Sequence, residues 1–357
     1  MNLKKAPPKN KTKSTSKLIS MGSLSVAPVA QDKLLALKKT ITSCKQLAIF
    51  CHDYPDPDAI ISAILLKKIA NHFKVPATVF YSGTISRSEN IVMFKQLKIP
   101  FQKSEGKNFD RFDGLATVDC QVGMGNLTFP KERCPNISID HHANVVPAKK
   151  ADLNICLTHM GAAATIVMHY YLSYRLPLTP PIANSYVYTL LSETKNFSRD
   201  VNKLDMDLYK MILQKCDLKK ISAIQLAKKS EKFYHLLQKA LKNYQLKDGI
   251  ICVDLGAIGD LNYIHEITET LSQIEGVKIS VAAGTKKDQG RICARSDHQS
   301  ANIGKVMKRA MKSLKKDDSQ ADGGGHAKMS AGVFSSDSKK ALDVFYNEVK
   351  KTESKKK

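Results

Sequence analysis

The chain contains no tryptophan, no pair of cysteines in C-x-x-C spacing and no apolar run long enough to span a bilayer. Its eight cysteines are scattered, and several lie inside apolar runs such as GIICVDLG. This pattern excludes a zinc ribbon and a disulfide framework, and it favours a reducing compartment, which we expect to be the cytoplasm. The best membrane candidate, MGAAATIVMHYYL, has only 13 residues. It is too short for a transmembrane helix, so we expect no membrane partner.

Arginine is missing from the lysine-rich start of the chain. The segment LISMGSLSVAPVA faintly resembles a signal or transit peptide, but serine and glycine dilute its apolar part. We expect residues 1–30 to form a disordered basic tail. Met21 is an alternative start codon that the sequence leaves open.

The net charge of +23 is strongly basic. Both ends are rich in lysine, yet the body between them is basic as well. A basic body favours a polyanionic partner such as nucleic acid or nucleotides, with a solvated surface as the alternative.

Apolar periodicity divides the chain into two α/β segments joined by a helical stretch. In the first, runs such as QLAIFCH, GLATVDC and NISIDHH alternate with helical spacing such as DAIISAILLKKIANHF. This alternation predicts a doubly wound, mainly parallel sheet with helices on both faces. The predicted strands GIICVDLG, VKISVAAGT and GRICARS indicate a smaller C-terminal α/β domain, with a cleft between the two domains. The predicted boundaries are a basic tail at 1–30, a first domain at 31–200, a helical connector at 201–235, a second domain at 236–348 and a basic tail at 349–357.

The stretch HDYPDPD concentrates charge where a predicted strand meets a predicted helix. His52 is followed closely by Asp53, Asp56 and Asp58. Repulsion among these carboxylates would destabilise the fold unless a cation binds there. Taken alone, the stretch also fits a solvated acidic turn.

Two further predicted strands end in the same residue types. Asp119 follows one, and Asp140, His141 and His142 follow the other. Ligands of parallel sheets bind beyond the carboxyl ends of the strands. Three strands that place His and Asp at one edge favour a metal site over a chance cluster.

Carboxylates and imidazoles without thiolates suit hard or borderline divalent ions. Mn²⁺ is the natural candidate, with Mg²⁺, Co²⁺ or Zn²⁺ as alternatives. The spacing of His52, Asp56 and Asp58 can present ligands to two adjacent ions, and Asp119 could bridge them. Two ions roughly 3.5–4 Å apart suit in-line phosphoryl displacement by a bridging water that becomes hydroxide near neutral pH.

In this order, HDYPDPDAIISA, TVDCQVGMGN, IDHH, SETKNF and ARS…GGGHAKMSAG resemble the motifs of the DHH–DHHA1 phosphoesterases. The resemblance covers roughly residues 45–335. That family includes RecJ-like exonucleases, nanoRNases that also act as pAp phosphatases, and cyclic-dinucleotide phosphodiesterases.

The resemblance implies a role for each motif residue. One ion would be bound by His52 and Asp56, the second by Asp58 and His141, and both by Asp119. Glu193 stands where the fourth motif usually supplies an aspartate to the second ion, so its role as a ligand is the least certain. Asp140 would support the site as a carboxylate behind the ligands, and His142 would contact the scissile phosphate. Asp53 has no family role.

The second domain carries the expected substrate contacts. Gly323, Gly324 and Gly325 would let backbone N–H groups approach a phosphate, as a glycine-rich loop does. His326 would add a donor, and Arg295, with the adjoining Ser296, a guanidinium fork for phosphate oxygens. An ordinary turn is the alternative.

We therefore expect a metal-dependent phosphoesterase of the nanoRNase or pAp phosphatase type that acts on short RNA, short DNA or nucleotides with two Mn²⁺ ions. The modest length resembles these enzymes more than long RecJ exonucleases. Alternatives are a cyclic- or linear-dinucleotide phosphodiesterase, a RecJ-type exonuclease and a degenerate, non-catalytic nucleotide-binding protein. The sequence leaves open whether the protein forms a homodimer.

Overall fold

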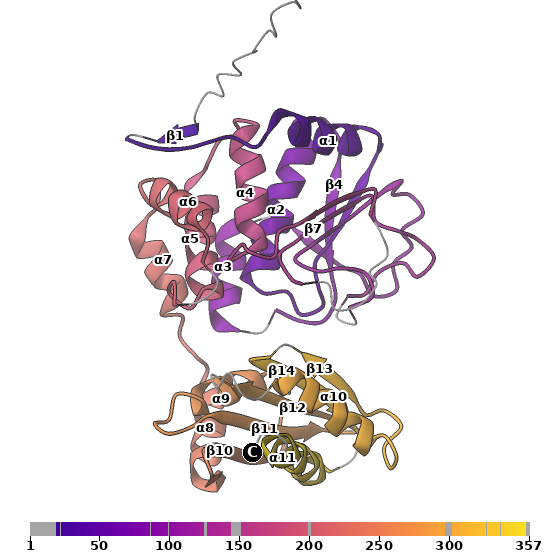
Figure 1. Cartoon of the computed structure of the whole chain (residues 1–357), viewed down its shortest axis with the longest axis vertical. Helices are drawn as coiled ribbons and strands as arrows, with labels where there is room; N and C mark the ends of the chain where they lie inside the picture. Colours follow the sequence, from indigo (N-terminus) through magenta and orange to yellow (C-terminus); the bar gives the residue numbers. More distant parts are fainter. Residues whose placement is uncertain are drawn as a thin grey trace, which may run out of the picture. The chain divides into compact units, whose positions relative to one another are not determined.

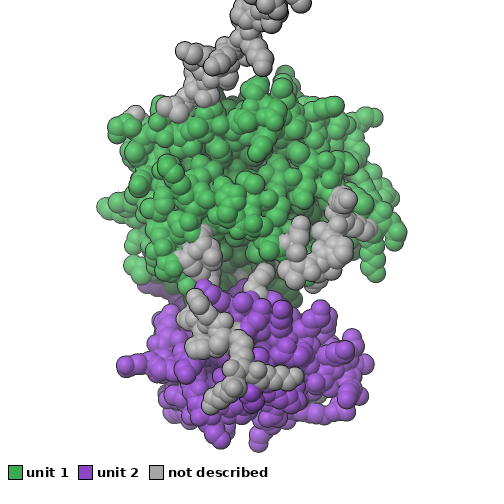
Figure 2. Space-filling view, in the orientation of Figure 1, with its two compact units in different colours: residues 1–227 green, residues 228–357 purple. Residues whose placement is uncertain are grey.

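The computed structural model describes residues 19–21, 23–85, 87–98, 100–124, 127–143, 151–198, 201–296, 302–325, 327–335 and 337–354. The chain divides into two compact units, residues 1–227 and residues 228–357 (Figure 2). Within the described ranges, no helix is both long enough and apolar enough to cross a membrane.

The first unit is built around a six-stranded sheet in the order β5-β4-β3-β6-β7-β8, and every neighbouring pair is parallel. From β3 the chain proceeds outward to β4 and β5, then returns to place β6 on the other side of β3. The boundary between β3 and β6 is therefore a topological switch point, where open parallel sheets bind their ligands. The strands are β3 (Leu47–Phe50), β4 (Ala77–Tyr81), β5 (Phe101–Lys103), β6 (Gly114–Val118), β7 (Ile137–Asp140) and β8 (Leu153–Cys156).

Helices cover one face of this sheet (Figure 1). Alternate strand residues such as Ile49, Val79 and Val118 pack into the same apolar core as these helices. The helix α2 lies at the centre of this layer and packs on α4 and α5. The helices are α1 (Gln31–Thr42), α2 (Pro57–His72), α3 (Ser88–Leu97), α4 (Ala163–Ser173), α5 (Pro180–Glu193), α6 (Lys203–Leu213) and α7 (Leu218–Gln225).

The opposite face differs from the expectation of helices on both sides. Its strand residues Phe50 and Phe80 pack against Phe112, with Phe109 and Phe129 added at the margin. These three partners come from connecting segments, so in the described ranges an aromatic layer of loops covers this face. Among the described residues, the segments between β5 and β6 and between β6 and β7 contain no helix, and they supply these three phenylalanines instead.

The ends of the predicted domains also differ from expectation. In the predicted tail 1–30, β1 (Ile19–Met21) and β2 (Leu24–Val26) form a hairpin, and Val29 is buried in the first core. Residues 1–18 lie outside the described residues. The predicted connector 201–235 is not a separate body, since α6 and α7 pack on α5 in the first unit. At the other end, α11 continues into the predicted tail at 349–357 as far as Ser354.

The second unit contains a mixed six-stranded sheet in the order β13-β14-β12-β11-β10-β9. Only β10 and β11 are parallel; the other pairs are antiparallel. One face packs on α10 and α11 and the other on α8 and α9. The elements are α8 (Glu231–Asn243), β9 (Gln245–Lys247), β10 (Ile250–Ala257), α9 (Tyr263–Leu271), β11 (Ile279–Lys286), β12 (Gln289–Ser296), α10 (Ile303–Leu314), β13 (Asp322–Gly325), β14 (Met329–Phe334) and α11 (Ser338–Ser354).

Candidate metal centre

The carboxyl ends of β3, β6 and β7 deliver their polar residues to one edge of the first sheet. His52 follows β3, Asp119 follows β6, and Asp140 ends β7 immediately before His141. The start of α2 adds its two aspartates at the same edge, because this helix begins five residues after His52. The structure thus brings together residues separated by almost ninety positions.

His52 forms the first half of the site. Its Nδ1 lies 2.9 Å from the backbone carbonyl oxygen of Asp53, which selects the tautomer with the proton on Nδ1. Its Nε2 is then the nitrogen that can bind an ion once it is deprotonated, and it lies 3.6 Å from Asp56 Oδ1 and 3.6 Å from Asp119 Oδ2. These distances exceed a normal hydrogen bond. They suit side chains that would hold one ion between them.

His141 forms the second half in the same way. Its Nδ1 lies 3.0 Å from the carbonyl oxygen of Met160. Its Nε2 lies 3.6 Å from Asp58 Oδ2 and 3.5 Å from Asp119 Oδ1. A backbone carbonyl behind each imidazole is the usual support of a metal-ligating histidine.

Asp119 joins the two halves, because its two carboxylate oxygens face different histidines. Its backbone adopts φ +56°, an uncommon conformation that aspartate tolerates better than most residues. Its Oδ1 is buried and, among the described residues, has no hydrogen-bond partner. A buried carboxylate oxygen without a donor is costly, and a bound cation would satisfy it. The residues present therefore fit a divalent ion on each side of Asp119.

Two of the candidate ligands also cap helices. Asp56 is the N-cap of α2, and its Oδ1 accepts hydrogen bonds from the N–H groups of Asp58 and Ala59. Asp58 accepts from the N–H groups of Ala163 and Ala164, at the start of α4, at 2.8 and 2.7 Å. Each carboxylate is thus held by a helix terminus, which stabilises negative charge.

Behind the histidines, Asp140 is fully engaged in hydrogen bonds. Its Oδ1 accepts from the backbone N–H of His141 and lies 2.9 Å from His142 Nδ1. Its Oδ2 accepts a 2.6 Å hydrogen bond from the buried amide of Gln121. Asp140 therefore orients His142, and both of its oxygens are engaged with groups of the protein. Gln121 was not predicted from the sequence as part of the site. The signal that could have indicated it is a polar residue two positions after Asp119.

Protonation of the centre follows from burial and crowding. Burial lowers the pKa of both His52 and His141, but the neighbouring carboxylates outweigh it and raise these pKa values to about 10 and about 11. Burial raises the pKa of Asp56, but the positive charge of His52 outweighs it, so this pKa lies below its usual range. Burial, followed by the negative charge of Asp119, raises the pKa of Asp58. Without a metal ion, protonated His52 and His141 therefore form ion pairs with the surrounding carboxylates.

Glu193 is the last residue of α5. Burial raises the pKa of its carboxyl well above the usual range, and the charges of Asp56, Asp58 and Asp119 raise it further. This interaction places the carboxyl within electrostatic range of both halves of the site. Among the described residues, the groups whose ligand atoms lie within 4.8 Å of one another are His52, Asp56 and Asp119, and Asp119, His141 and His142; Glu193 belongs to neither group.

The cysteines beside the motifs are not candidate ligands. Cys51 and Cys120 are buried, and their thiols donate to the backbone carbonyls of Ala59 and Val118. Burial raises the pKa of both thiols well above the usual value. Both residues are protonated and structural.

The second unit holds the other predicted contacts, with differences. Arg295 lies on β12, with Nη2 3.5 Å from Glu269 Oε2 and a side chain 19% exposed. Ser296 is buried, and its hydroxyl donates to the carbonyl of Lys278, so it supports the strand. His326 lies outside the described residues.

The three glycines do not form a loop. They belong to the edge strand β13, which pairs with β14. A Cβ at Gly323 would lie 2.8 Å from the carbonyl oxygen of Ala331, and one at Gly325 would lie 2.6 Å from Ser330 Cα. Only Gly324 faces open space. Two of the glycines are therefore required by close packing of the hairpin, independently of any ligand.

Comparisons with known proteins agree with this architecture. Residues 46–192 match the model of the DHH family, N-terminal domain, and residues 248–354 match that of the DHHA1 domain. An uncharacterized protein of Methanocaldococcus jannaschii is 28% identical over 320 residues, which cover 87% of this chain and 63% of that protein. The chain therefore spans less than two thirds of the length of this relative.

Solved structures that share the fold include the following two. An exopolyphosphatase-related protein from Bacteroides fragilis is 16% identical with a TM-score of 0.67, and the match covers 92% of this chain and 98% of that one. RecJ of Thermus thermophilus, in complex with Mn²⁺, is 12% identical with a TM-score of 0.50, and the match covers 91% of this chain and 54% of that one.

Proposed function

Because this chain belongs to the DHH–DHHA1 family, we propose that it is a metal-dependent phosphoesterase that hydrolyses short oligonucleotides or nucleotide phosphates. The observation that carries this proposal is Asp119, whose two oxygens face His52 and His141 on opposite sides. Two adjacent cation sites that share one carboxylate are suited to phosphoryl transfer.

The first ion would be held by His52, Asp56 and Asp119, and the second by Asp58, His141 and Asp119. Manganese is the proposed metal, since the ligand set contains only carboxylates and imidazoles and the structurally similar Thermus RecJ holds Mn²⁺. When bound, such ions lower the pKa of a water molecule and neutralise phosphoryl oxygens.

Residues around the metal centre orient the side chains that would contact the substrate. Asp140 Oδ1 lies 2.9 Å from His142 Nδ1 and orients this ring, which we assign to contact with the substrate phosphate. Gln121 holds the second oxygen of Asp140 and keeps that carboxylate in place. Arg295 of the second unit, with a side chain 19% exposed, is kept as a proposed phosphate contact.

The compartment proposed is the cytoplasm. All eight cysteines are free thiols, including the exposed Cys134, and free thiols persist in reducing conditions.

The proposal is tested with a substrate panel in added Mn²⁺. The panel contains an RNA dinucleotide, a DNA dinucleotide, adenosine 3′,5′-bisphosphate, a cyclic dinucleotide and inorganic polyphosphate. The last is included because the similar Bacteroides protein is named exopolyphosphatase-related. We expect hydrolysis of at least one nucleotide substrate, abolished by EDTA and by Asp119→Asn. Binding of nucleotides without any turnover would instead support the degenerate, non-catalytic alternative.

A further inference from the structure

Tyr54 occupies an uncommon backbone conformation beside the metal centre. It lies between His52 and Asp56 with φ +58°, and it precedes Pro55. A non-glycine residue with positive φ is strained, and a following proline restricts it further. Strain of this kind persists where the surroundings enforce it, and it is concentrated at functional sites.

The contacts of Tyr54 show what enforces this conformation. Its N–H donates a 2.9 Å hydrogen bond to the carbonyl of Ser82, just beyond β4. Its ring lies against Gly83, where an added Cβ would be only 2.6 Å from Tyr54 Cδ1. Gly83 itself has φ +71°. Both this backbone conformation and the close contact with Tyr54 require glycine at this position. The Tyr54 ring therefore packs on Gly83, which has no side chain. Tyr54 is 49% exposed.

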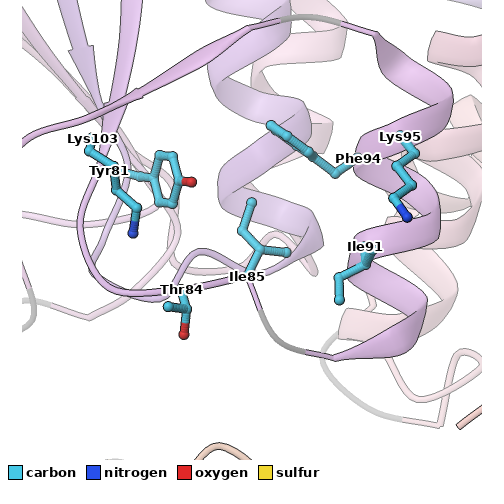
Figure 3. Close-up of a pocket in the computed structure, with 7 residues that line it drawn as sticks. All are labelled: Tyr81, Thr84, Ile85, Ile91, Phe94, Lys95 and Lys103. Carbon is cyan, nitrogen blue, oxygen red and sulfur yellow. The ribbon is translucent and has the colours of Figure 1, made fainter. Parts of the chain in front are cut away.

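A hollow of about 330 Å³ begins at the next residues along this segment. It lies between the ends of β4 and β5 on one side and α3 on the other (Figure 3). Its walls include the rings of Tyr81 and Phe94, and its cations are Lys95 and Lys103. The lining residues are Tyr81, Thr84, Ile85, Ile91, Phe94, Lys95 and Lys103.

The charged residues that line this hollow are all cationic, and the nearby carboxylate of Glu105 accepts hydrogen bonds from the Ser82 hydroxyl and the Gly83 N–H. Two of its seven lining residues are lysines, and none is a carboxylate. Lys103 Nζ lies 4.5 Å from the ring centroid of Tyr81, so this ammonium is held over an aromatic face. A hollow that combines apolar and aromatic walls with two lysines suits a ligand that is both aromatic and anionic.

The metal centre, Tyr54 and the hollow follow one line along the sheet edge. The centre lies beyond β3 and β6, Tyr54 lies over the end of β4, and the hollow extends to β5. In the sheet register Phe50 is opposite Phe80, and Tyr81 is opposite Lys103. Neighbouring strands are about 4.8 Å apart, so β3 and β5 are separated by roughly 10 Å. That span is comparable to one or two nucleotides.

We propose that a short oligonucleotide binds along this edge, with a base stacked on Tyr54 and the next phosphate held by Lys95 and Lys103. The inference rests on the proposed function and assigns the part of the substrate beyond the scissile bond. Base stacking on tyrosine and phosphate contacts with lysine are the usual means of holding a single strand.

The first experiment, the stacking arm, tests whether a base stacks on Tyr54. It makes use of the fact that the chain contains no tryptophan. In the Tyr54→Trp variant the single indole reports directly on the site. The full-length variant is titrated in EDTA with a triribonucleotide, an abasic trinucleotide and inorganic phosphate. We expect the triribonucleotide alone to quench the emission. The matched control is Tyr234→Trp, at a tyrosine 59% exposed on the second unit, which should not respond. Equal quenching by the abasic compound, or none at saturation, overturns the stacking assignment.

The phosphate arm measures binding of a labelled triribonucleotide by anisotropy in EDTA. The Lys95→Ala/Lys103→Ala variant should bind about tenfold more weakly, with a salt slope reduced by roughly 1.4. The control Lys39→Ala/Lys45→Ala removes the same charge near the start of β3, at the opposite sheet edge, where both lysines are exposed. Its affinity should change less than about twofold. Equal losses in the two variants would mean nonspecific attraction and overturn the phosphate site.

Both arms are independent of catalysis. Binding with the expected pattern but no Mn²⁺-dependent hydrolysis would refute the proposed function and leave this site intact. Hydrolysis without the expected quenching and affinity changes would refute this site alone.

Discussion

The Asp58 carboxylate, in the first turn of α2, accepts a 2.7 Å hydrogen bond from the backbone N–H of Ala164, in the first turn of α4. The N-cap of α4 is Ala162, whose side chain cannot accept a hydrogen bond. A residue 106 positions earlier in the chain therefore satisfies this helix terminus. The same carboxylate is a candidate ligand, so metal binding and the packing of α4 are coupled.

Replacing Asp58 should destabilise the protein even without metal. Asp58→Ala leaves the N–H groups of Ala163 and Ala164 buried without an acceptor. We expect a loss of about 1–3 kcal/mol in EDTA. Calorimetry of the first unit's transition and hydrogen exchange of those two amides measure the effect. Asp58→Asn keeps one acceptor oxygen and should lie between the alanine variant and the wild type. An unchanged alanine variant would show that α4 does not need this cap.

Asp119→Asn should abolish turnover, because both halves of the centre use this carboxylate. Asparagine tolerates the φ of +56° found at this position, so the fold should be retained. The measurements are Mn²⁺ binding by calorimetry and hydrolysis over a range of Mn²⁺ concentrations. We expect no recovery at excess Mn²⁺. A rate above roughly a tenth of wild type would contradict the assignment of Asp119 to both ions.

Glu193→Gln distinguishes a ligand from a neighbouring carboxylate. If Glu193 binds the second ion, the Mn²⁺ concentration for half-maximal activity should rise about tenfold or more. Glu193→Asp, which carries the residue type usual in the family, should restore most of the affinity. The exposed Glu231 offers a control, since Glu231→Gln lies on the second unit and should change nothing. A normal Mn²⁺ requirement for Glu193→Gln would remove this residue from the ligand set.

Binding of Mn²⁺ should release protons. The pKa values of His52 and His141 are raised to about 10 and about 11, above the unfolded value near 6.5. Both are therefore protonated at neutral pH without metal. Their ion pairs stabilise the metal-free fold fully below about pH 6.5, and this contribution is lost as pH rises through about 10.

A metal ligand must be a neutral imidazole, so Mn²⁺ affinity should increase with pH. Calorimetry at pH 7 in buffers of different ionisation enthalpy should report a release of at least two protons, one from each histidine, and Asp58, whose pKa is raised to about 8, should add to that number. Each single variant, His52→Ala or His141→Ala, should lower that number by about one. Binding without proton release would mean that these histidines are neutral in the metal-free protein.

The N-terminal hairpin should be required for stability. Val29 is buried, and its N–H donates to Ser173 Oγ on α4. The carbonyl oxygen of Ala27 lies 2.7 Å from His169 Nε2 on the same helix. Deletion of residues 1–30 should lower the melting temperature by several degrees. Deletion of residues 1–18 should have little effect, and equal melting temperatures for both truncations would contradict this role.

Much of the fold was predictable because strands and helices of the first unit carry strong periodic signals. The apolar runs at β3, β6 and β7 end in His or Asp, and parallel topology places such ends at one edge. The ligand types of the candidate centre were therefore evident from the sequence, and the DHH and DHHA1 matches confirm the family interpretation.

The polar contacts around those residues were not predictable. The contact of Asp58 with α4 joins residues more than a hundred positions apart. The support of Asp140 by Gln121 requires the register of β6 against β7. Neither leaves a periodic or spacing signal, because Asp58 contacts two backbone N–H groups and Asp140 contacts the Gln121 side chain only once distant segments have packed.

By itself, the sequence determined the residue types and the order of strands that carry the centre, because the spacing of these residues and their positions at strand ends are local properties of the chain. Only the tertiary structure decided that Tyr54 is aligned on Gly83, that Gly323–Gly325 form an edge strand, and that aromatic loops cover one sheet face. The physical reason is that glycine and aromatic residues act through close approach of distant segments. Such contacts exist only after the sheets and helices have packed.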